Sequence, residues 1–228
     1  MIERARGHRI MTSRAALVPA LVAAFLMDPV VMSLSLSPTT IAAGANSTAT
    51  FTTKGVTTAI TLVSLSSSKT AVATVPATTG VESKLNSGTF AVHGVSGAAG
   101  CSIISAKIGT GTPKTATVFV TPPAATGLLR VSVPGNGAVG GQTVTGSLMW
   151  MAAPTGPGIV VNLSSNSPNA TVPASVTIPP SAVNETGVAV VQFQIQTSVV
   201  APTTCAVITG TSGGNTARAL LKIATISG

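Results

Sequence analysis

The chain has few of the side chains that perform chemistry. Of its 228 residues, 7% are charged and 3% are aromatic, and tyrosine is absent. Acidic residues number 4 and histidines 2, which is too few to assemble an acid/base pair, a catalytic triad or a metal cage. We therefore predict that the protein is not an enzyme, and we expect no catalytic, cofactor-binding or metal-binding residues.

Long apolar runs are also absent beyond residue 33, where Thr, Ser, Gly or Pro interrupts every apolar stretch. This excludes a protein with several transmembrane helices, because each would need about 20 apolar residues. Hydrophobic residues nevertheless make up 45% of the chain, which is enough to bury a core and excludes a disordered chain. Abundant Val, Ile and Thr, with 23 Gly and 15 Pro between them, are typical of half-buried strands joined by tight turns. The composition predicts an all-β globular protein.

The positive charge is concentrated at the amino terminus. The net charge is +8, and four of the six arginines lie in the first 14 residues. The other basic residues are spread along the chain without a basic run, whereas a nucleic-acid-binding surface needs clustered cations and aromatic rings for stacking. We therefore expect no nucleic-acid partner.

The first 33 residues have the pattern of a targeting segment. Arginines precede an apolar stretch from Ala15 to Met27, which has the length of a signal-peptide core and is short for a membrane span. The pattern predicts a signal peptide or an N-terminal anchor over residues 1–33. If this segment is retained, we expect membrane contact only through residues 15–27. A translation start at Met11 is an alternative.

Beyond residue 33 the chain repeats itself, and this repeat is its most informative feature. A Leu-Ser-Ser segment at residues 65–67 recurs at residues 163–165, with an offset of 98. An Ala-Thr-Val-Pro-Ala segment at residues 73–77 recurs at residues 170–174, with an offset of 97. Cys101 and Cys205 each open an apolar strand that is followed by a turn and a last strand. This register predicts two copies of one domain.

Each copy has the pattern of a β-sandwich, with short alternating strands separated by turn signals. In the second copy Val191, Phe193 and Ile195 alternate with glutamines, which predicts an apolar inner row and a polar outer row. We expect a first sandwich over residues 34–123 and a second over residues 128–228. The linker at residues 124–127, which follows Pro122 and Pro123 and ends at Gly127, would join them end to end as a short, semi-rigid segment.

Several short motifs together resemble the tandem bacterial immunoglobulin-like repeats of surface and secreted proteins, of the invasin and intimin type. The resemblance covers about residues 30 to 226 and implies two immunoglobulin-like antiparallel sandwiches that serve as a spacer or an adhesive unit. It carries over no catalytic residue. The motifs are Leu34-Ser35-Leu36-Ser37-Pro38, Leu65-Ser66-Ser67, Ala73-Thr74-Val75-Pro76, Ile208-Thr209-Gly210-Thr211 and Thr216-Ala217-Arg218-Ala219-Leu220-Leu221.

The candidate interface residues are Cys101, Cys205 and Trp150. Each copy holds one cysteine, and in domains strung end to end the two would be separated by about a domain length, well beyond the ~7 Å Cα limit for a bridge. The sequence therefore predicts no intrachain disulfide. Strand parity places Cys101 and Ile103 on an outer face, so the alternatives are a half-buried thiol and an intermolecular bond. Trp150 suits either a core position or an interface anchor.

We expect a non-enzymatic structural or adhesive module of a secreted or cell-surface bacterial protein. Its action would reside in sheet faces, loops and exposed strand edges, and the edges would also allow self-assembly. The sequence does not specify which protein or surface glycan it binds. Two alternatives are a decorating subunit of a virion or filament, and an accessory binding module of a larger secreted enzyme.

Overall fold

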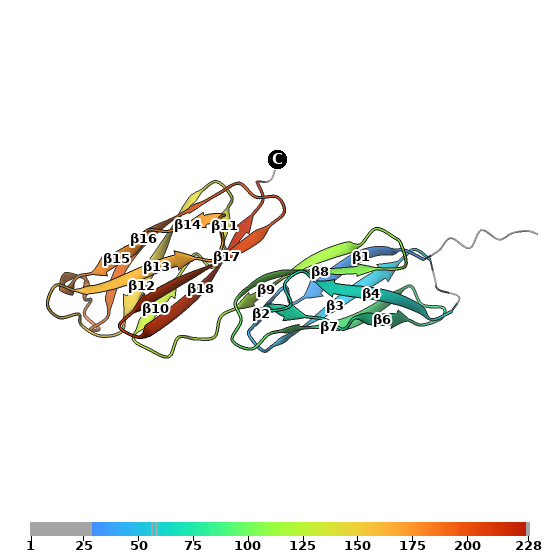
Figure 1. The fold of residues 1–228 in the computed structure, drawn as a ribbon, viewed down its shortest axis with the longest axis horizontal. Coiled ribbons are helices and arrows are strands. Elements are labelled where there is room, and N and C mark those ends of the chain that lie inside the picture. Colours follow the sequence, from blue (N-terminus) through green and yellow to red (C-terminus); the bar gives the residue numbers. More distant parts are fainter. Residues whose placement is uncertain (1–28, 56, 58, 227–228) are drawn as a thin grey trace, which may run out of the picture.

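The computed structural model describes residues 29–55, 57 and 59–226, and the strands in this part of the chain form four sheets. The sheets pair into two β-sandwiches (Figure 1). The single helical element among the described residues is a 3-10 turn, η1, at Pro180–Ala182. The predicted all-β class is confirmed.

The first sandwich consists of a four-stranded and a five-stranded sheet. The four-stranded sheet has the order β1-β3-β7-β5, and the five-stranded sheet has the order β2-β9-β8-β4-β6. All neighbours pair antiparallel except β2 and β9, which are parallel. The strands are β1 (Val31–Ser37), β2 (Thr40–Ala42), β3 (Asn46–Thr53), β4 (Thr61–Ser67), β5 (Ala73–Thr74), β6 (Thr78–Val81), β7 (Ser87–Gly94), β8 (Gly100–Lys107) and β9 (Lys114–Thr121).

The second sandwich repeats this scheme strand for strand. Its sheets have the orders β10-β12-β16-β14 and β11-β18-β17-β13-β15, and β11 and β18 form its single parallel pair. The strands are β10 (Leu129–Ser132), β11 (Ala138–Val139), β12 (Thr143–Trp150), β13 (Ile159–Ser165), β14 (Ala170–Thr171), β15 (Ser175–Ile178), β16 (Ala189–Thr197), β17 (Thr204–Ser212) and β18 (Asn215–Ala224).

The strand orders are those of an immunoglobulin-like sandwich. The order β1-β3-β7-β5 opposite β9-β8-β4 corresponds to the A-B-E-D and G-F-C sheets of that fold. Strand β6 adds an edge beside β4, and β2 extends the first strand onto the second sheet. The repeated Leu-Ser-Ser segments lie in β4 and β13, and the repeated Ala-Thr pairs form β5 and β14. The repeat in the sequence is therefore a repeat of structure.

Each sandwich has its own apolar core, and the predicted strand parity holds. Phe193 is 4% exposed and Ile195 is fully buried, whereas the glutamines between them are exposed. The ring of Phe193 lies directly over Gly146 on β12, the neighbouring strand of the same sheet. A Cβ atom at Gly146 would come within 2.5 Å of the ring. Phe51 covers Gly88 in the first core in the same way, at 2.6 Å. Glycine is required at both positions because the ring occupies the space of a side chain.

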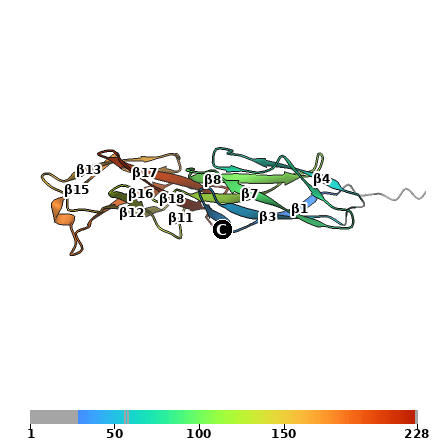
Figure 2. The same cartoon turned by 90° about the horizontal axis from the view of Figure 1, so that it is seen from below.

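The two sandwiches lie one beyond the other along the long axis of the molecule (Figures 1 and 2). Residues 122–128, the connecting segment, run along the flank of the second sandwich. Residues 123–126 border β18 at Thr216 and Arg218, and the backbone N–H of Leu128 donates to Asn215 Oδ1 over 2.9 Å. The segment thus leads from the end of β9 along the first half of β18 to the β17–β18 turn.

This path reverses the second sandwich relative to the first. The end of β18 and the start of β17 lie beside the first sandwich, near the middle of the molecule (Figure 1). The sequence predicted a short, semi-rigid linker between two domains strung end to end. Instead the segment packs on the second sandwich, where Ala125 contacts the apolar core.

Candidate functional site at the domain junction

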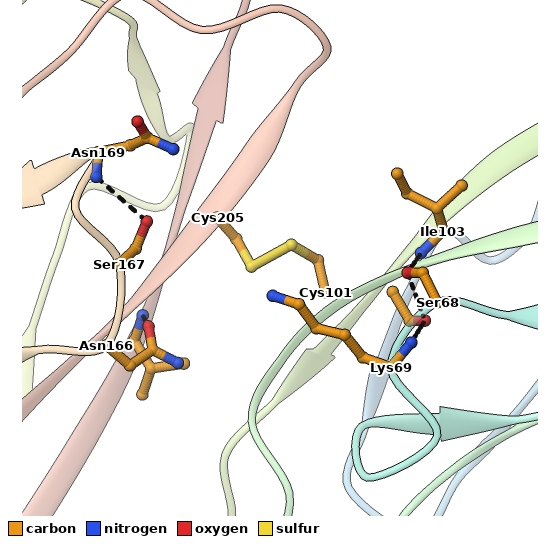
Figure 3. The surroundings of a disulfide bond; sticks show 10 residues. Ser68, Lys69, Cys101, Ile103, Asn166, Ser167, Asn169 and Cys205 are labelled. Carbon is orange, nitrogen blue, oxygen red and sulfur yellow. Dashed lines mark hydrogen bonds between the residues drawn. A yellow bond between two sulfur atoms is a disulfide. The ribbon is translucent and has the colours of Figure 1, made fainter.

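A disulfide bond joins Cys101 of β8 to Cys205 of β17 and so connects the two sandwiches (Figure 3). Their Cα atoms are 6.0 Å apart, within the usual range for a disulfide. The prediction of no intrachain disulfide is therefore wrong, and neither a free thiol nor an intermolecular bond describes this state. The prediction assumed that both domains point the same way, whereas the reversal brings the starts of β8 and β17 together.

The predicted outward orientation of Cys101 is correct. Ile103, two residues further along the strand, is 38% exposed, whereas Ile104 between the sheets is fully buried. Cys101 itself is only 7% exposed because the second sandwich covers it. The disulfide is thus built from outer faces and adds a contact to the sandwiches without entering either core.

A small apolar and cationic cluster surrounds the disulfide. Phe119 of β9 is 7% exposed and packs with both cysteines and with Leu220 of β18. The Nζ atom of Lys222 lies 4.8 Å from the centroid of the Phe119 ring and donates to Thr40 Oγ1 over 2.6 Å. A lysine over an aromatic face is an attractive cation–π pair. We call these residues, Thr40, Cys101, Phe119, Cys205, Leu220 and Lys222, the domain junction.

Matching loops flank the two cysteines. In the first sandwich the N–H of Ile103 donates to Ser68 Oγ over 2.9 Å, and in the second the N–H of Val207 donates to Asn166 Oδ1 over 2.8 Å. Return bonds run from the N–H of Ser68 to the Ile103 carbonyl and from the N–H of Asn166 to the Val207 carbonyl. The same bonding scheme therefore holds one loop of each domain beside its cysteine.

Two hollows lie against the disulfide between the sandwiches. One has a volume of about 370 Å³ and the other about 250 Å³. Lys69, Asn169 and Thr204 line both of them, and Figure 3 shows Lys69 extending from the first sandwich toward the disulfide. Residues of both sandwiches line these hollows, so their shape depends on the closed junction.

The junction residues other than the cysteines were not predicted from the sequence. One usable signal was Phe119, which lies between the inward-facing Val118 and Val120 on β9 and therefore points outward. A large outward aromatic residue beside an outward cysteine indicates a covered surface. A second signal was the equivalent placement of the two cysteines, since equivalent positions meet when two copies face each other.

Trp150 does not belong to the junction. It is 8% exposed and packs in the core of the second sandwich with Leu129 and Ala189. The structure thus favours the core interpretation and contradicts the interface interpretation of this residue. His93, on the outer face of β7, is exposed and its Nδ1 lies 2.7 Å from Asn46 Oδ1.

The described residues also bear on metal and membrane binding. Within residues 29–55, 57 and 59–226, no three His, Cys, Asp or Glu side chains gather where they could hold a metal ion. In that same part of the chain, no helix has the length and hydrophobicity to cross a membrane. The candidate targeting segment, residues 1–33, lies almost wholly outside the described residues.

Comparison with known proteins gives matches to solved structures alone. No protein-family model and no curated protein matches the chain. The D0-D1 domains of intimin are 14% identical, with a TM-score of 0.36, and the match covers 86% of this chain and 100% of that one. Domains 5-6 of the S-layer protein SbsC are 18% identical, with a TM-score of 0.31, over 87% of this chain and 100% of that one.

The adhesin InvE of Yersinia pseudotuberculosis also matches. It is 15% identical, with a TM-score of 0.32, and the match covers 83% of this chain and 58% of that one. TM-scores this low carry no functional inference. The class of the protein, two tandem immunoglobulin-like β-sandwiches, follows from its own strand order.

Proposed function

We propose that the chain is a non-enzymatic structural module of a secreted or cell-surface protein of bacterial type, acting as a spacer or a binding surface. The observation that carries this proposal is the Cys101–Cys205 disulfide. Structural disulfides persist in oxidising compartments and are rare in the cytosol. The arginines and the apolar stretch that precede the described residues support export on independent grounds.

The disulfide also supports a structural role. Two sandwiches joined by a flexible linker alone would change their relative orientation freely, whereas a covalent bond between outer faces holds them as one elongated unit. Seven of the eight edge strands have 2 to 4 residues, and β1 has 7. Short edges limit pairing with the strands of other proteins. The geometry therefore favours a spacer whose binding, if any, occurs through loops and sheet faces.

The state of the two cysteines in the native protein tests this proposal. The protein is recovered from separated cytosolic, envelope, medium and particle fractions into a thiol-alkylating reagent, and its intact mass is measured with and without prior reduction. We expect protein in the envelope or medium, with no label before reduction and 2 labels after it, one for each cysteine. Recovery from the cytosol with both thiols alkylated without reduction would contradict the proposal. Recovery in particles with residues 1–33 retained would favour the virion or filament alternative.

A further inference from the structure

Equivalent residues of the two repeats meet at the domain junction. Cys101 and Cys205 are each the second residue of their strands, β8 and β17. Phe119 is the cross-strand partner of Cys101, and Lys222 is the cross-strand partner of Cys205. Phe119 and Lys222 are therefore equivalent, and they too contact each other.

The same relation holds for whole strands and loops. Strand β8 contacts its equivalent β17, and β9 contacts its equivalent β18. Lys69, in the loop after β4 of the first sandwich, faces residues 166–169, the corresponding loop of the second, across the hollow of about 250 Å³. Contacts between equivalent residues are the mark of a twofold axis, as in a symmetric dimer. The chain is thus folded onto itself as an internal pseudo-dimer.

The apolar cluster of this contact is small. Its buried apolar residues are the two cysteines and Phe119, with Leu220 packed beside them. Specific protein interfaces bury about 1,200 to 2,000 Å² and involve about 20 residues on each side. The junction therefore depends on its disulfide to stay closed.

The connecting segment does not hold the junction shut by itself. Residues 122–127 make no backbone-to-backbone hydrogen bond to another described residue, and Pro122 and Pro123 have no N–H to donate. The segment is attached by packing of Ala125 and by hydrogen bonds at its end: Leu128 N–H donates to Asn215 Oδ1, Met151 N–H donates to the Leu128 carbonyl, and Arg130 Nη1 donates to the Gly127 carbonyl. Once the disulfide opens, residues 122–126, which make no backbone-to-backbone hydrogen bond, can leave the flank of β18 while residues 127 and 128 stay attached.

We propose that the domain junction is a self-association surface, and that its partner is a second copy of this chain. In the resulting dimer, Cys101 of each chain is bonded to Cys205 of the other, and each first sandwich contacts the second sandwich of its partner. All contacts between the two sandwiches are kept, because the same surfaces meet in the same way, and only the packing of the connecting segment along β18 is given up. Such an exchange of identical units is a low-cost route to a dimer. The proposal does not depend on the compartment in which the protein resides.

The exchange needs a thiol as a catalyst and involves no net oxidation. A glutathione thiolate attacks one sulfur of the intrachain disulfide, forming a mixed disulfide and releasing the other cysteine as a thiolate. That thiolate attacks the disulfide of a second chain. The cysteine released there attacks the mixed disulfide, which frees glutathione again. Two intrachain bonds become two interchain bonds.

Concentration decides between the two forms. Within one chain, a short connecting segment gives the partner surface an effective concentration of order mM. The closed monomer therefore dominates in dilute solution, and the exchanged dimer becomes substantial when the chain itself approaches that concentration, as in a densely packed surface layer.

An isotope-mixing experiment on the full chain tests the exchange. Equal amounts of ¹⁵N-labelled and unlabelled protein are incubated in a glutathione redox buffer from about 10 μM to about 1 mM, a range that reaches the effective concentration. After acid quenching, the dimer is separated without reduction and its Cys101–Cys205 peptides are analysed by mass. We expect a dimer fraction that rises with concentration, with about half of its linked peptides carrying one labelled and one unlabelled half. Linked peptides of single isotopic origin at every concentration would overturn the proposal.

Single-cysteine variants test whether the surface, rather than the thiol alone, directs the pairing. Cys205→Ser and Cys101→Ser chains are mixed and oxidised with oxidised glutathione. The mixed dimer restores the contact between Phe119 and Lys222, whereas a Cys101→Ser homodimer would bring two lysines together. We expect the ratio of mixed dimer to total homodimer, which is about 1 for random pairing of equal amounts, to rise to about 2 to 5, and this ratio to fall in the Lys222→Ala background. Statistical proportions throughout would mean random collision of exposed thiols and would refute the proposal.

Discussion

Removal of the disulfide is the perturbation whose effect the structure defines best. We consider the double variant Cys101→Ser/Cys205→Ser, because a single substitution would leave a reactive thiol. The bond joins residues that are 104 positions apart. Closing a loop of about 100 residues lowers the entropy of the unfolded chain enough to stabilise the folded state by about 4.7 kcal/mol. The bonded residues lie on outer faces, so neither core is disturbed by the change.

Trp150 makes the assay specific for one domain. It is the single tryptophan of the chain and is buried in the second core, so its fluorescence follows the unfolding of the second sandwich, while circular dichroism follows both. We expect the double variant to unfold at lower urea concentration than the wild-type protein. The total free energy of unfolding should fall by about 4.7 kcal/mol. In a thermal scan this loss of free energy corresponds to a decrease in Tm of roughly 10 to 20 °C. We also expect the two probes to diverge, since the domains are then joined only by the connecting segment.

Reduced wild-type protein is the matched control. It should reproduce the unfolding curve of the double variant, and reductant should leave the double variant unchanged. A loss below about 1 kcal/mol, or coincident transitions from both probes in the double variant, would refute the reasoning. The first result would mean that the disulfide does not close the loop, and the second that noncovalent contacts already couple the domains.

Four further predictions concern the cores and the surface. Phe193→Ala should lower the free energy of unfolding by about 3 to 5 kcal/mol in urea denaturation, because it truncates a buried ring; a loss below about 1 kcal/mol would contradict the strand parity. Gly146→Ala should lower the free energy of unfolding by about 1 to 3 kcal/mol, since the new Cβ would meet that ring. Gly135→Ala is its control and should change the free energy of unfolding by less than about 0.5 kcal/mol, because a Cβ atom at Gly135 would meet open space. His93→Ala should likewise stay within about 1 kcal/mol, because its contact with Asn46 is exposed; a larger loss in the same denaturation assay would reveal a structural role. Trp150 fluorescence should be quenched by acrylamide far less in the folded than in the unfolded protein, and equal quenching would show that the ring is exposed.

Local pattern was enough to predict the elements of each domain. The alternation around Phe193 predicted which side chains face the core, and the outward parity of Cys101 was correct. Both follow from the two-residue period of a strand, which any one segment displays by itself. The repeated Leu-Ser-Ser and Ala-Thr segments predicted two copies of one fold for the same reason, because each copy contains all the residues that specify it.

The relation between the copies could not be predicted in this way. It depends on where the connecting segment runs, and that path is decided by its packing along β18 and by the bond from Leu128 to Asn215, residues that are 87 positions apart. The wrong prediction for the cysteines came from this step alone, since their face was predicted correctly and only the direction of the second domain was not.

The sequence by itself determined the strand pattern, the two cores and the outward placement of Cys101, because these depend on short-range periodicity and on the burial of apolar side chains. The tertiary structure alone decided that the second sandwich is reversed, that equivalent surfaces meet and that Cys101 bonds to Cys205. Strand periodicity specifies which face of a sheet a residue occupies, whereas the partner of that face depends on how two complete domains pack against each other.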